Sequence, residues 1–82
     1  MDIWALGVLV YYLIDGNSPF LEKSEEKIRN KILRNQVTFE SEVWENASFN
    51  CKKFIKKCLN YNPEDRPTAE DLLSDPFIMR DA

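Results

Sequence analysis

Carboxylates are the most frequent side chains in this sequence that could do chemistry, and several stand in adjacent pairs. The pairs are Glu25-Glu26, Glu64-Asp65 and Glu70-Asp71. Acid/base catalysis by a pair of carboxyl groups needs both groups to face one substrate, whereas these pairs fall where helix caps and exposed turns are expected. The chain has no histidine, which excludes a Ser-His-Asp arrangement and leaves no base to activate a cysteine. The two glycines stand alone, so there is no glycine-rich phosphate loop, and no charge pattern resembles a calcium loop.

Length and composition limit the kinds of protein that this sequence can be. Eighty-two residues allow one domain at most, and a hydrophobic content of 44% predicts packed structure. Eleven basic against 14 acidic residues give a net charge of −3, which argues against a nucleic-acid-binding protein. A zinc site lacks ligands. We therefore expect no metal or cofactor in this chain and no nucleic-acid partner.

The two cysteines indicate the compartment. Cys51 and Cys58 are seven positions apart in a predicted helix, which separates their Cα atoms by about 10 Å. A disulfide requires roughly 4.4–6.8 Å. We expect two reduced thiols on a buried face and hence an intracellular, cytoplasmic protein.

Residues 3–14 form an uncharged apolar run between Asp2 and Gly16. The run is shorter than the ~20 residues of a membrane span and lacks the flanks of a secretory signal, so no membrane association is expected. Asp2 as N-cap and Gly16 as C-cap predict a helix. A helix with apolar side chains on every side must be covered by other segments on every side. A chain of this length has too few other apolar residues to do so. We expect a piece of a larger domain.

Three further helices and no sheet are predicted, which makes the class all-α. One begins after Ser24, with Ile28, Ile32 and Leu33 as a narrow apolar stripe. Another follows Ser48, and a short one follows Thr68, where Asp71 completes a capping box. Residues 35–47 are expected to be extended with local turns. The expected apolar anchors outside the first two helices are Val37, Phe39, Val43, Trp44, Cys51, Phe54, Ile55, Cys58, Leu59, Leu72, Leu73, Phe77 and Ile78.

Two sets of residues are not explained by the helices themselves. Asp2 precedes a buried helix, Gly7 interrupts it at a cost of ~1 kcal/mol, and Arg66 lies in a loop between Asp65 and Pro67. Each suggests contact with a segment outside this chain. Four lysines on the outer side of the third helix could touch nucleic acid or acidic lipid, but a solvated face is the preferred interpretation; they are Lys52, Lys53, Lys56 and Lys57.

Three motifs follow one another along the chain. Asp2-Ile3-Trp4-Ala5-Leu6-Gly7 matches D-x-W-x-x-G, Gly16 to Phe20 matches G-x-x-P-F, and residues 62–68 supply an arginine bracketed by prolines. In this order the motifs resemble the end of a eukaryotic protein kinase domain. The chain is most similar to the calmodulin-dependent and calcium-dependent group of serine/threonine kinases, over essentially its whole length. Asp75 and Phe77 depart from the His-Pro-Trp ending that is usual in that group.

The resemblance implies a role for particular residues. Asp2, Trp4, Gly7 and Arg66 are similar to residues that support the catalytic loop and the activation segment, with Asp2 accepting backbone hydrogen bonds and Arg66 pairing with a glutamate. Leu9 and Leu13 match supports of the hydrophobic column below the adenine. Residues that could dock a substrate or a regulator are Tyr12, Pro19, Phe20, Ile28 and Ile32.

The sequence has none of the motifs that bind ATP or transfer phosphate, including the glycine-rich loop, His-Arg-Asp and Asp-Phe-Gly. We therefore expect residues 1–82 to be a partial kinase domain, inactive alone, whose partner is the rest of the domain. ATP and Mg²⁺ are implied for the parent kinase, which acts on a protein substrate. The alternatives are a free-standing, kinase-derived helical interaction module that docks regulators through residues 20–35, and the tail of a pseudokinase scaffold. A nucleic-acid-binding helical protein is a distant further alternative.

Overall fold

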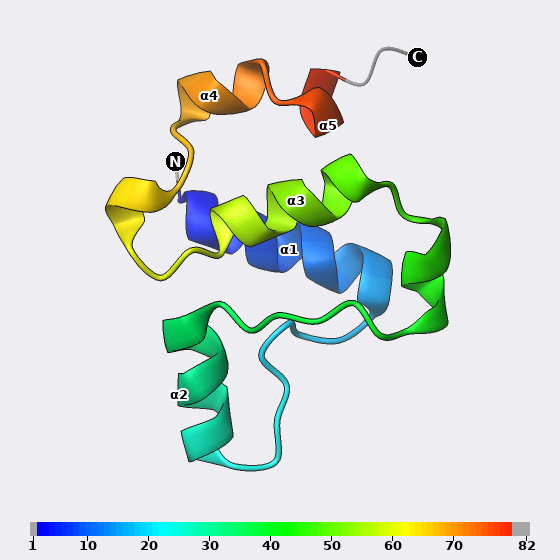
Figure 1. The fold of residues 1–82 in the computed structure, drawn as a ribbon, viewed down its shortest axis with the longest axis vertical. Helices are drawn as coiled ribbons and strands as arrows, with labels where there is room; N and C mark the ends of the chain where they lie inside the picture. Colours follow the sequence, from blue (N-terminus) through cyan, green and yellow to red (C-terminus); the bar gives the residue numbers. More distant parts are fainter. Residues whose placement is uncertain (1, 80–82) are drawn as a thin grey trace.

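The computed structural model describes residues 2–79, which form helices without any strand (Figure 1). The α-helices are α1 (Ile3–Asp15), α2 (Glu25–Arg34), α3 (Phe49–Cys58), α4 (Ala69–Leu73) and α5 (Pro76–Met79). Two 3₁₀ helices, η1 (Glu42–Asn46) and η2 (Pro63–Asp65), occur in the connections. The predicted all-α class is confirmed, with α5 as the expected short terminal segment.

Helix α1 begins and ends where its capping residues predict. The Asp2 carboxylate accepts a hydrogen bond from the Ala5 N–H at 3.0 Å. Gly16 adopts a φ of 92°, a left-handed conformation that glycine takes without strain, and its N–H donates to the Tyr12 carbonyl at 2.8 Å. These local signals are sufficient to set both ends of the helix.

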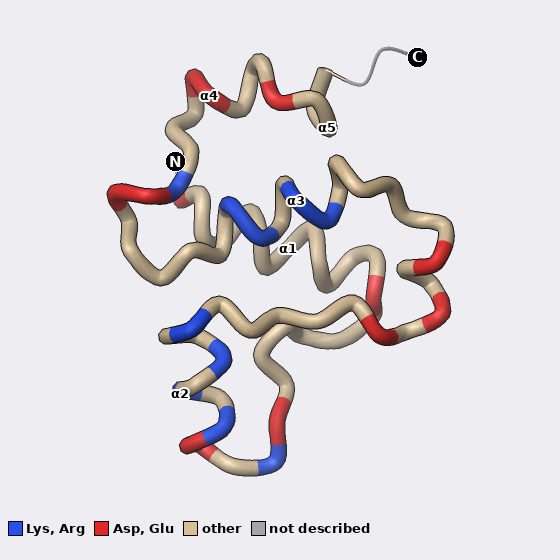
Figure 2. Tube along the Cα trace, in the orientation of Figure 1, with Lys and Arg blue, Asp and Glu red and all other residues tan. Residues whose placement is uncertain are grey.

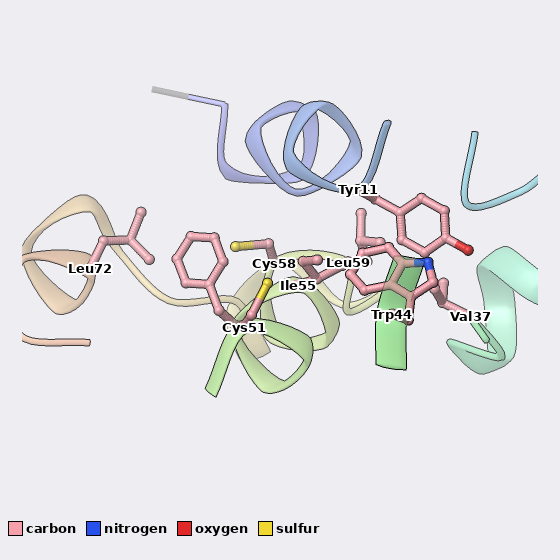
Figure 3. Packing of buried hydrophobic residues seen from close by; sticks show 9 residues of the cluster. Tyr11, Val37, Trp44, Cys51, Ile55, Cys58, Leu59 and Leu72 are labelled. Carbon is pink, nitrogen blue, oxygen red and sulfur yellow. The ribbon is translucent and has the colours of Figure 1, made fainter. Parts of the chain in front are cut away.

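The core lies between α1 and α3, which pack side by side (Figures 1 and 3). Gly7 makes this approach possible, because a Cβ added there would lie 2.6 Å from the Cys58 Cβ. Phe54, Ile55 and Leu59 are completely or almost completely buried, and each such side chain stabilises the fold by roughly 1.5–3 kcal/mol. Every residue of the apolar face predicted for the third helix is buried, so that prediction is confirmed.

Residues 36–47 hold an aromatic cluster against the C-terminal half of α1. The rings of Tyr11 and Trp44 are 4.9 Å apart, and Phe39 meets Trp44 edge-on at 4.7 Å. Trp44 donates from its indole N–H to the Asp15 carboxylate at 2.7 Å. Val37 is buried as expected, but the prediction for Val43 was wrong, because η1 turns that side chain into solvent.

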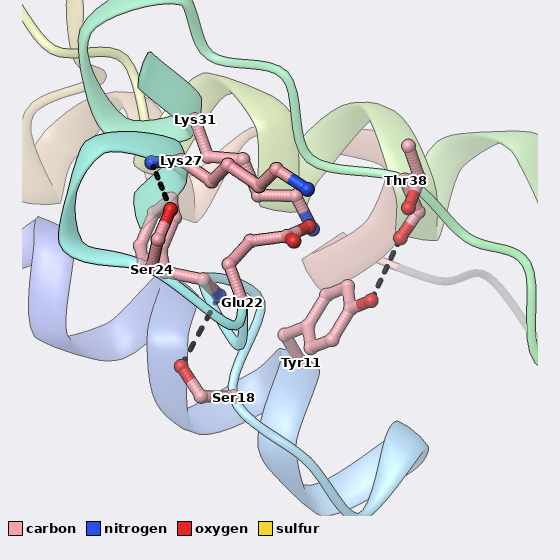
Figure 4. A network of polar contacts seen from close by, with 8 residues as sticks. Tyr11, Ser18, Glu22, Ser24, Lys27, Lys31 and Thr38 are labelled. Atoms are coloured by element: carbon pink, nitrogen blue, oxygen red, sulfur yellow. Dashed lines mark hydrogen bonds and ion pairs between the residues drawn. The ribbon is translucent and has the colours of Figure 1, made fainter. Parts of the chain in front are cut away.

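Helix α2 stands apart from this core and has no buried residue (Figures 1 and 2). Ser24 caps it by accepting from the Lys27 N–H, and Lys31 forms an ion pair with Glu22 at 3.0 Å (Figure 4). At its C-terminal end, the Asn35 side chain donates to the Lys56 carbonyl of α3 at 3.1 Å. Helix α2 is therefore joined to α3 at its C-terminal end, and the predicted apolar stripe is left open along its length.

Helix α5 packs on α3, and α4 packs on α5. Thr68 and Asp71 form the predicted capping box of α4, and the ring of Phe77 lies 5.1 Å from that of Phe54. Leu72 is buried, but the predictions for Leu73 and Ile78 were wrong, since both are exposed. Helices of four and five residues have too few turns for a spacing pattern to distinguish their inner and outer sides.

Candidate functional site

Three side chains from distant parts of the chain stack at the N-terminal end of α1. The Phe20 ring lies parallel to the Trp4 ring, with centroids 5.2 Å apart and 7° between planes. The Arg66 guanidinium carbon lies 4.9 Å from the centroid of the Trp4 ring, within the range of a cation–π interaction. We call Trp4, Phe20 and Arg66 the Trp4 stack. It fixes the loops after α1 and after η2 to the start of α1.

Arg66 is held by the carbonyls of its own loop. Its Nε donates to the Asn60 carbonyl at 2.7 Å and a terminal nitrogen donates to the Tyr61 carbonyl at 3.1 Å. No carboxylate of residues 2–79 forms an ion pair with this guanidinium. A guanidinium has five N–H donors, so the remaining donors are available at the surface beside Trp4.

Asp2 lies exposed at the same end of α1. One of its carboxylate oxygens caps the helix through Ala5, and within the described part of the chain the other oxygen accepts no hydrogen bond. Figure 2 shows the start of α1 beside the segment that carries Arg66. The structure thus places an anionic acceptor, Asp2, close to a cationic donor, Arg66. Within the described residues, Asp2 has a carboxylate oxygen and Arg66 has N–H groups that form no hydrogen bond.

Gly7 has its partner inside the chain. The expected contact with an outside segment was wrong for this residue, because α3 supplies the closely packed neighbours, Cys58 and Leu59. Spacing alone identified the need for a close approach but not which helix makes it.

The side of α1 that faces away from α3 is open. Leu9, Tyr12 and Leu13 are 52%, 54% and 72% exposed. Removing an apolar side chain from water is favourable by ~25 cal/mol for each Å², so three such residues along one helix face are typical of a surface that another segment covers. Coverage of α1 within this chain is therefore limited to one side, as the length of the chain predicted.

The predicted docking residues divide between buried and exposed positions. Pro19 is buried, and Phe20 belongs to the Trp4 stack. Ile28 and Ile32 line an open groove of about 460 Å³ along α2. Tyr61 lies across this groove and was missed by the sequence analysis, because its loop position carries no periodic signal. We call this groove, lined also by Glu25, Arg29 and Leu33, the α2 groove.

The buried ionisable groups are not poised for catalysis. Burial, with a smaller contribution from Asp75, raises the pKa of the Cys58 thiol to about 11. Burial raises the pKa of Tyr11 to about 12, assisted by Asp15, and the Tyr11 hydroxyl donates to the Thr38 carbonyl at 2.7 Å (Figure 4). Both cysteines are free. In residues 2–79 no three potential ligands gather into a metal site, and no helix has the length and apolarity to cross a bilayer.

Comparison with known proteins identifies the family to which these motifs belong. The model of the protein kinase domain matches residues 1–78. The chain belongs to the protein kinase family. Its kinase relatives include the calcium/calmodulin-dependent protein kinase type I of Schizosaccharomyces pombe (strain 972 / ATCC 24843), 42% identical over 78 residues. Another is calcium-dependent protein kinase 17 of Arabidopsis thaliana, 44% identical over 80 residues.

The kinase match covers nearly all of this chain but a small part of each relative. These two alignments include 95% and 98% of the chain, yet 23% and 15% of the relatives. A solved structure titled "Titin kinase and its flanking domains" superposes with a TM-score of 0.85 at 31% identity, covering 98% of this chain and 15% of that one. The predicted similarity to the calmodulin-dependent and calcium-dependent serine/threonine kinases is confirmed, and the chain corresponds to a segment of a kinase domain.

Proposed function

We propose that residues 1–82 are the C-terminal subdomain of a serine/threonine protein kinase whose complete form transfers the γ-phosphate of ATP to protein serine or threonine. The observation that carries this proposal is the two-sided character of α1. One side packs on α3, and the opposite apolar side is open. In this proposal the rest of the kinase domain covers Leu9 and Leu13 on the open side.

The N-terminal end of α1 supports the catalytic loop and the activation segment. The second carboxylate oxygen of Asp2 accepts backbone N–H groups of the catalytic loop and so fixes its shape. The remaining donors of Arg66 pair with the glutamate that closes the activation segment. The Trp4 stack supports this assignment, because it holds Arg66 and the start of α1 together, while Gly7 sets the position of α1 on α3.

The open side of α1 supports the hydrophobic column. Leu9 and Leu13 point away from α3 and are more than half exposed, as expected of side chains that another layer of the kinase covers. ATP and Mg²⁺ are held by the parts of the parent kinase that carry the missing motifs, since this sequence has no phosphate loop and no catalytic loop. The chain alone is inactive, and its reduced thiols agree with a cytoplasmic, intracellular location.

Tyr12, Phe20 and the α2 groove form the docking surface for a protein substrate or a regulator. The groove supports this role because apolar side chains line it between charged residues, a composition typical of helix-in-groove recognition. Pro19 contributes to this surface indirectly, because its side chain is buried in the loop after α1.

A chimeric kinase tests the supporting role directly. The aligned 78 residues of the fission-yeast calcium/calmodulin-dependent kinase are replaced by those of this chain. We expect the chimera to phosphorylate a peptide with Mg²⁺-ATP in the presence of calcium and calmodulin, and the isolated chain to transfer no phosphate. A folded, ATP-binding chimera without activity would contradict the proposal, as would Mg²⁺-dependent transfer by the isolated chain.

A free-standing interaction module is the second candidate, favoured by the open α2 groove. The mass of the endogenous protein, detected with an antibody against residues 20–48, distinguishes the kinase subdomain from the interaction module. A band far above 9.7 kDa supports the kinase subdomain. A single band near 9.7 kDa supports the module, and a large protein without the catalytic and magnesium-binding motifs supports a pseudokinase scaffold.

A further inference from the structure

A basic groove lined by aromatic rings runs along the outer side of α3 and shares no lining residue with the α2 groove. It has a volume of about 520 Å³ and is lined by Phe39, Phe49, Asn60 and four lysines, namely Lys52, Lys53, Lys56 and Lys57. We call it the α3 groove. Its volume is within the range of sites that hold small ligands or a few side chains.

Three of the four lysines carry charges that residues 2–79 leave uncompensated. Lys57 forms an ion pair with Asp75 at 3.3 Å. No carboxylate within the described part of the chain lies within ion-pair distance of Lys52, Lys53 or Lys56. The whole chain has a net charge of −3, so this positive charge is a local surplus. Figure 2 shows basic residues on both α2 and α3, but α2 also carries Glu25 and Glu26, whereas α3 has no acidic residue. The local surplus on α3 fits an anionic partner.

The aromatic lining indicates that the partner is also partly apolar. Phe49 stands at the start of α3 and is 74% exposed, although its helix has a well-formed buried face on the other side. The Lys53 ammonium lies 5.9 Å from the centre of the Phe49 ring, so charge and apolar surface are presented together. Phe39 joins the groove to the core through its contact with Trp44.

Acidic residues restrict how far an anionic partner can extend. Glu42 and Glu45 lie on η1, next to the start of α3, and Glu40 follows Phe39. Figure 2 shows these acidic segments beyond the N-terminal end of the α3 lysines. A long polyanion or an anionic membrane surface would meet them and be repelled. A short segment with a few carboxylates would not.

We propose that the α3 groove binds a short acidic peptide segment that carries an aromatic or large aliphatic side chain. Its carboxylates pair with Lys52, Lys53 and Lys56, and its apolar side chain packs on Phe49. The acidic residues Glu42 and Glu45 next to the groove favour this short occupant over nucleic acid and lipid.

The experiment measures fluorescence anisotropy of a labelled twelve-residue peptide of glutamates and aspartates with two phenylalanines. We expect the 82-residue chain to bind it with micromolar affinity. The triple variant Lys52→Glu, Lys53→Glu, Lys56→Glu should weaken binding about tenfold or more, because the charge attraction is lost. Phe49→Ser should also weaken binding, because the apolar contact is lost. A control with the same net charge, Lys23→Glu, Lys27→Glu, Arg34→Glu, should keep most of the affinity.

Equal loss in the two triple variants would overturn the proposal, since net charge alone would then govern binding. Tighter binding of oligouridine or phosphatidylserine vesicles than of the peptide would also overturn it. Circular dichroism checks that the variants fold. NMR shift mapping on the unmodified chain gives a readout without any variant, and shifts confined to residues outside 39 and 49–60 would contradict the site. The chimeric kinase serves for the same titration if the isolated chain lacks stable structure.

Discussion

The backbone of Gly7 in α1 lies against the Cys58 side chain in α3, so closely that one methyl group cannot be added between them. The added Cβ would be 2.6 Å from the Cys58 Cβ and 3.1 Å from a Leu59 methyl carbon. Because real Cβ atoms do not approach this closely, a side chain at position 7 must move the two helices apart. The position of α1 in the fold depends on this contact.

The variant Gly7→Ala should be destabilised, although alanine is the better helix former. The gain of ~1 kcal/mol in helix propensity is smaller than the overpacking cost of typically 1–3 kcal/mol. Urea unfolding of the chain measures the change. Ala5→Gly on the exposed side of α1 is the control, with an expected loss of ~1 kcal/mol from propensity alone. If Gly7→Ala were stabilising, the close packing of α1 on α3 would be disproved.

Substitutions of Asp2 should separate helix capping from support of the catalytic loop. Asparagine caps a helix about as well as aspartate, whereas alanine costs about 1 kcal/mol. In the isolated chain, Asp2→Asn should therefore keep its stability and Asp2→Ala should lose it. In the chimeric kinase, Asp2→Asn should lower kcat at least about tenfold, because hydrogen bonds to a charged acceptor contribute ~1.5–3 kcal/mol. Full activity of a folded Asp2→Asn chimera would leave Asp2 with a capping role alone.

The Leu13 side chain should stabilise a complete kinase domain but contribute little to the stability of the isolated chain. Its side chain is 72% exposed, so Leu13→Ala in the isolated chain should change the free energy of unfolding by less than ~0.5 kcal/mol. In the chimera, where the rest of the kinase covers this side of α1, the same change should cost ~2–5 kcal/mol. Thermal unfolding of both proteins gives the comparison, with the exposed Leu73→Ala as a control that should be mild in each. Equal effects of Leu13→Ala in both proteins would refute the proposed covering.

The stability of the chain should fall at acid pH partly through Asp71. Hydrogen bonds from the Thr68 backbone N–H and side chain lower the pKa of the Asp71 carboxyl below its ordinary value of 3.8. In that range the unfolded state binds more protons than the folded state, so stability rises with pH. The contribution of Asp71 is complete above the ordinary pKa and is lost as the pH falls through the lowered one.

Urea midpoints between pH 5 and pH 2 measure this effect. As the pH is lowered, the urea midpoint of the variant Asp71→Asn should fall less steeply than that of the natural chain. Glu70→Gln, next to it in α4, is the control, because the Glu70 carboxylate accepts no hydrogen bond from residues 2–79. If Asp71→Asn left the fall of the urea midpoint with pH unchanged, other carboxyl groups would account for the acid sensitivity.

The features that the sequence predicted correctly are those with local causes. Asp2, Ser24, Ser48 and Thr68 each accept a hydrogen bond from a backbone N–H three residues on, so the start of each helix can be deduced from a few neighbouring residues. The buried face of α3 follows from spacing over ten residues.

The features that it did not predict depend on contacts between distant segments. Nothing near Gly7 in the sequence indicates that α3 is its neighbour. The bonds of Arg66 to the Asn60 and Tyr61 carbonyls depend on how that loop closes. Tyr61 becomes part of the α2 groove only because α2 lies beside the same loop.

The contact between Gly7 and Cys58 also has a consequence for synthesis on the ribosome. The two residues are roughly 50 positions apart, and translation at 5–20 residues per second takes about 3–10 s to cover that distance. During this interval α1 has been synthesised and its partner helix has not, so the side of α1 that packs on α3 lacks its native contact. Transiently exposed apolar surface makes a nascent chain prone to aggregation, so we expect α1 to be the segment of this chain that a chaperone would bind during synthesis.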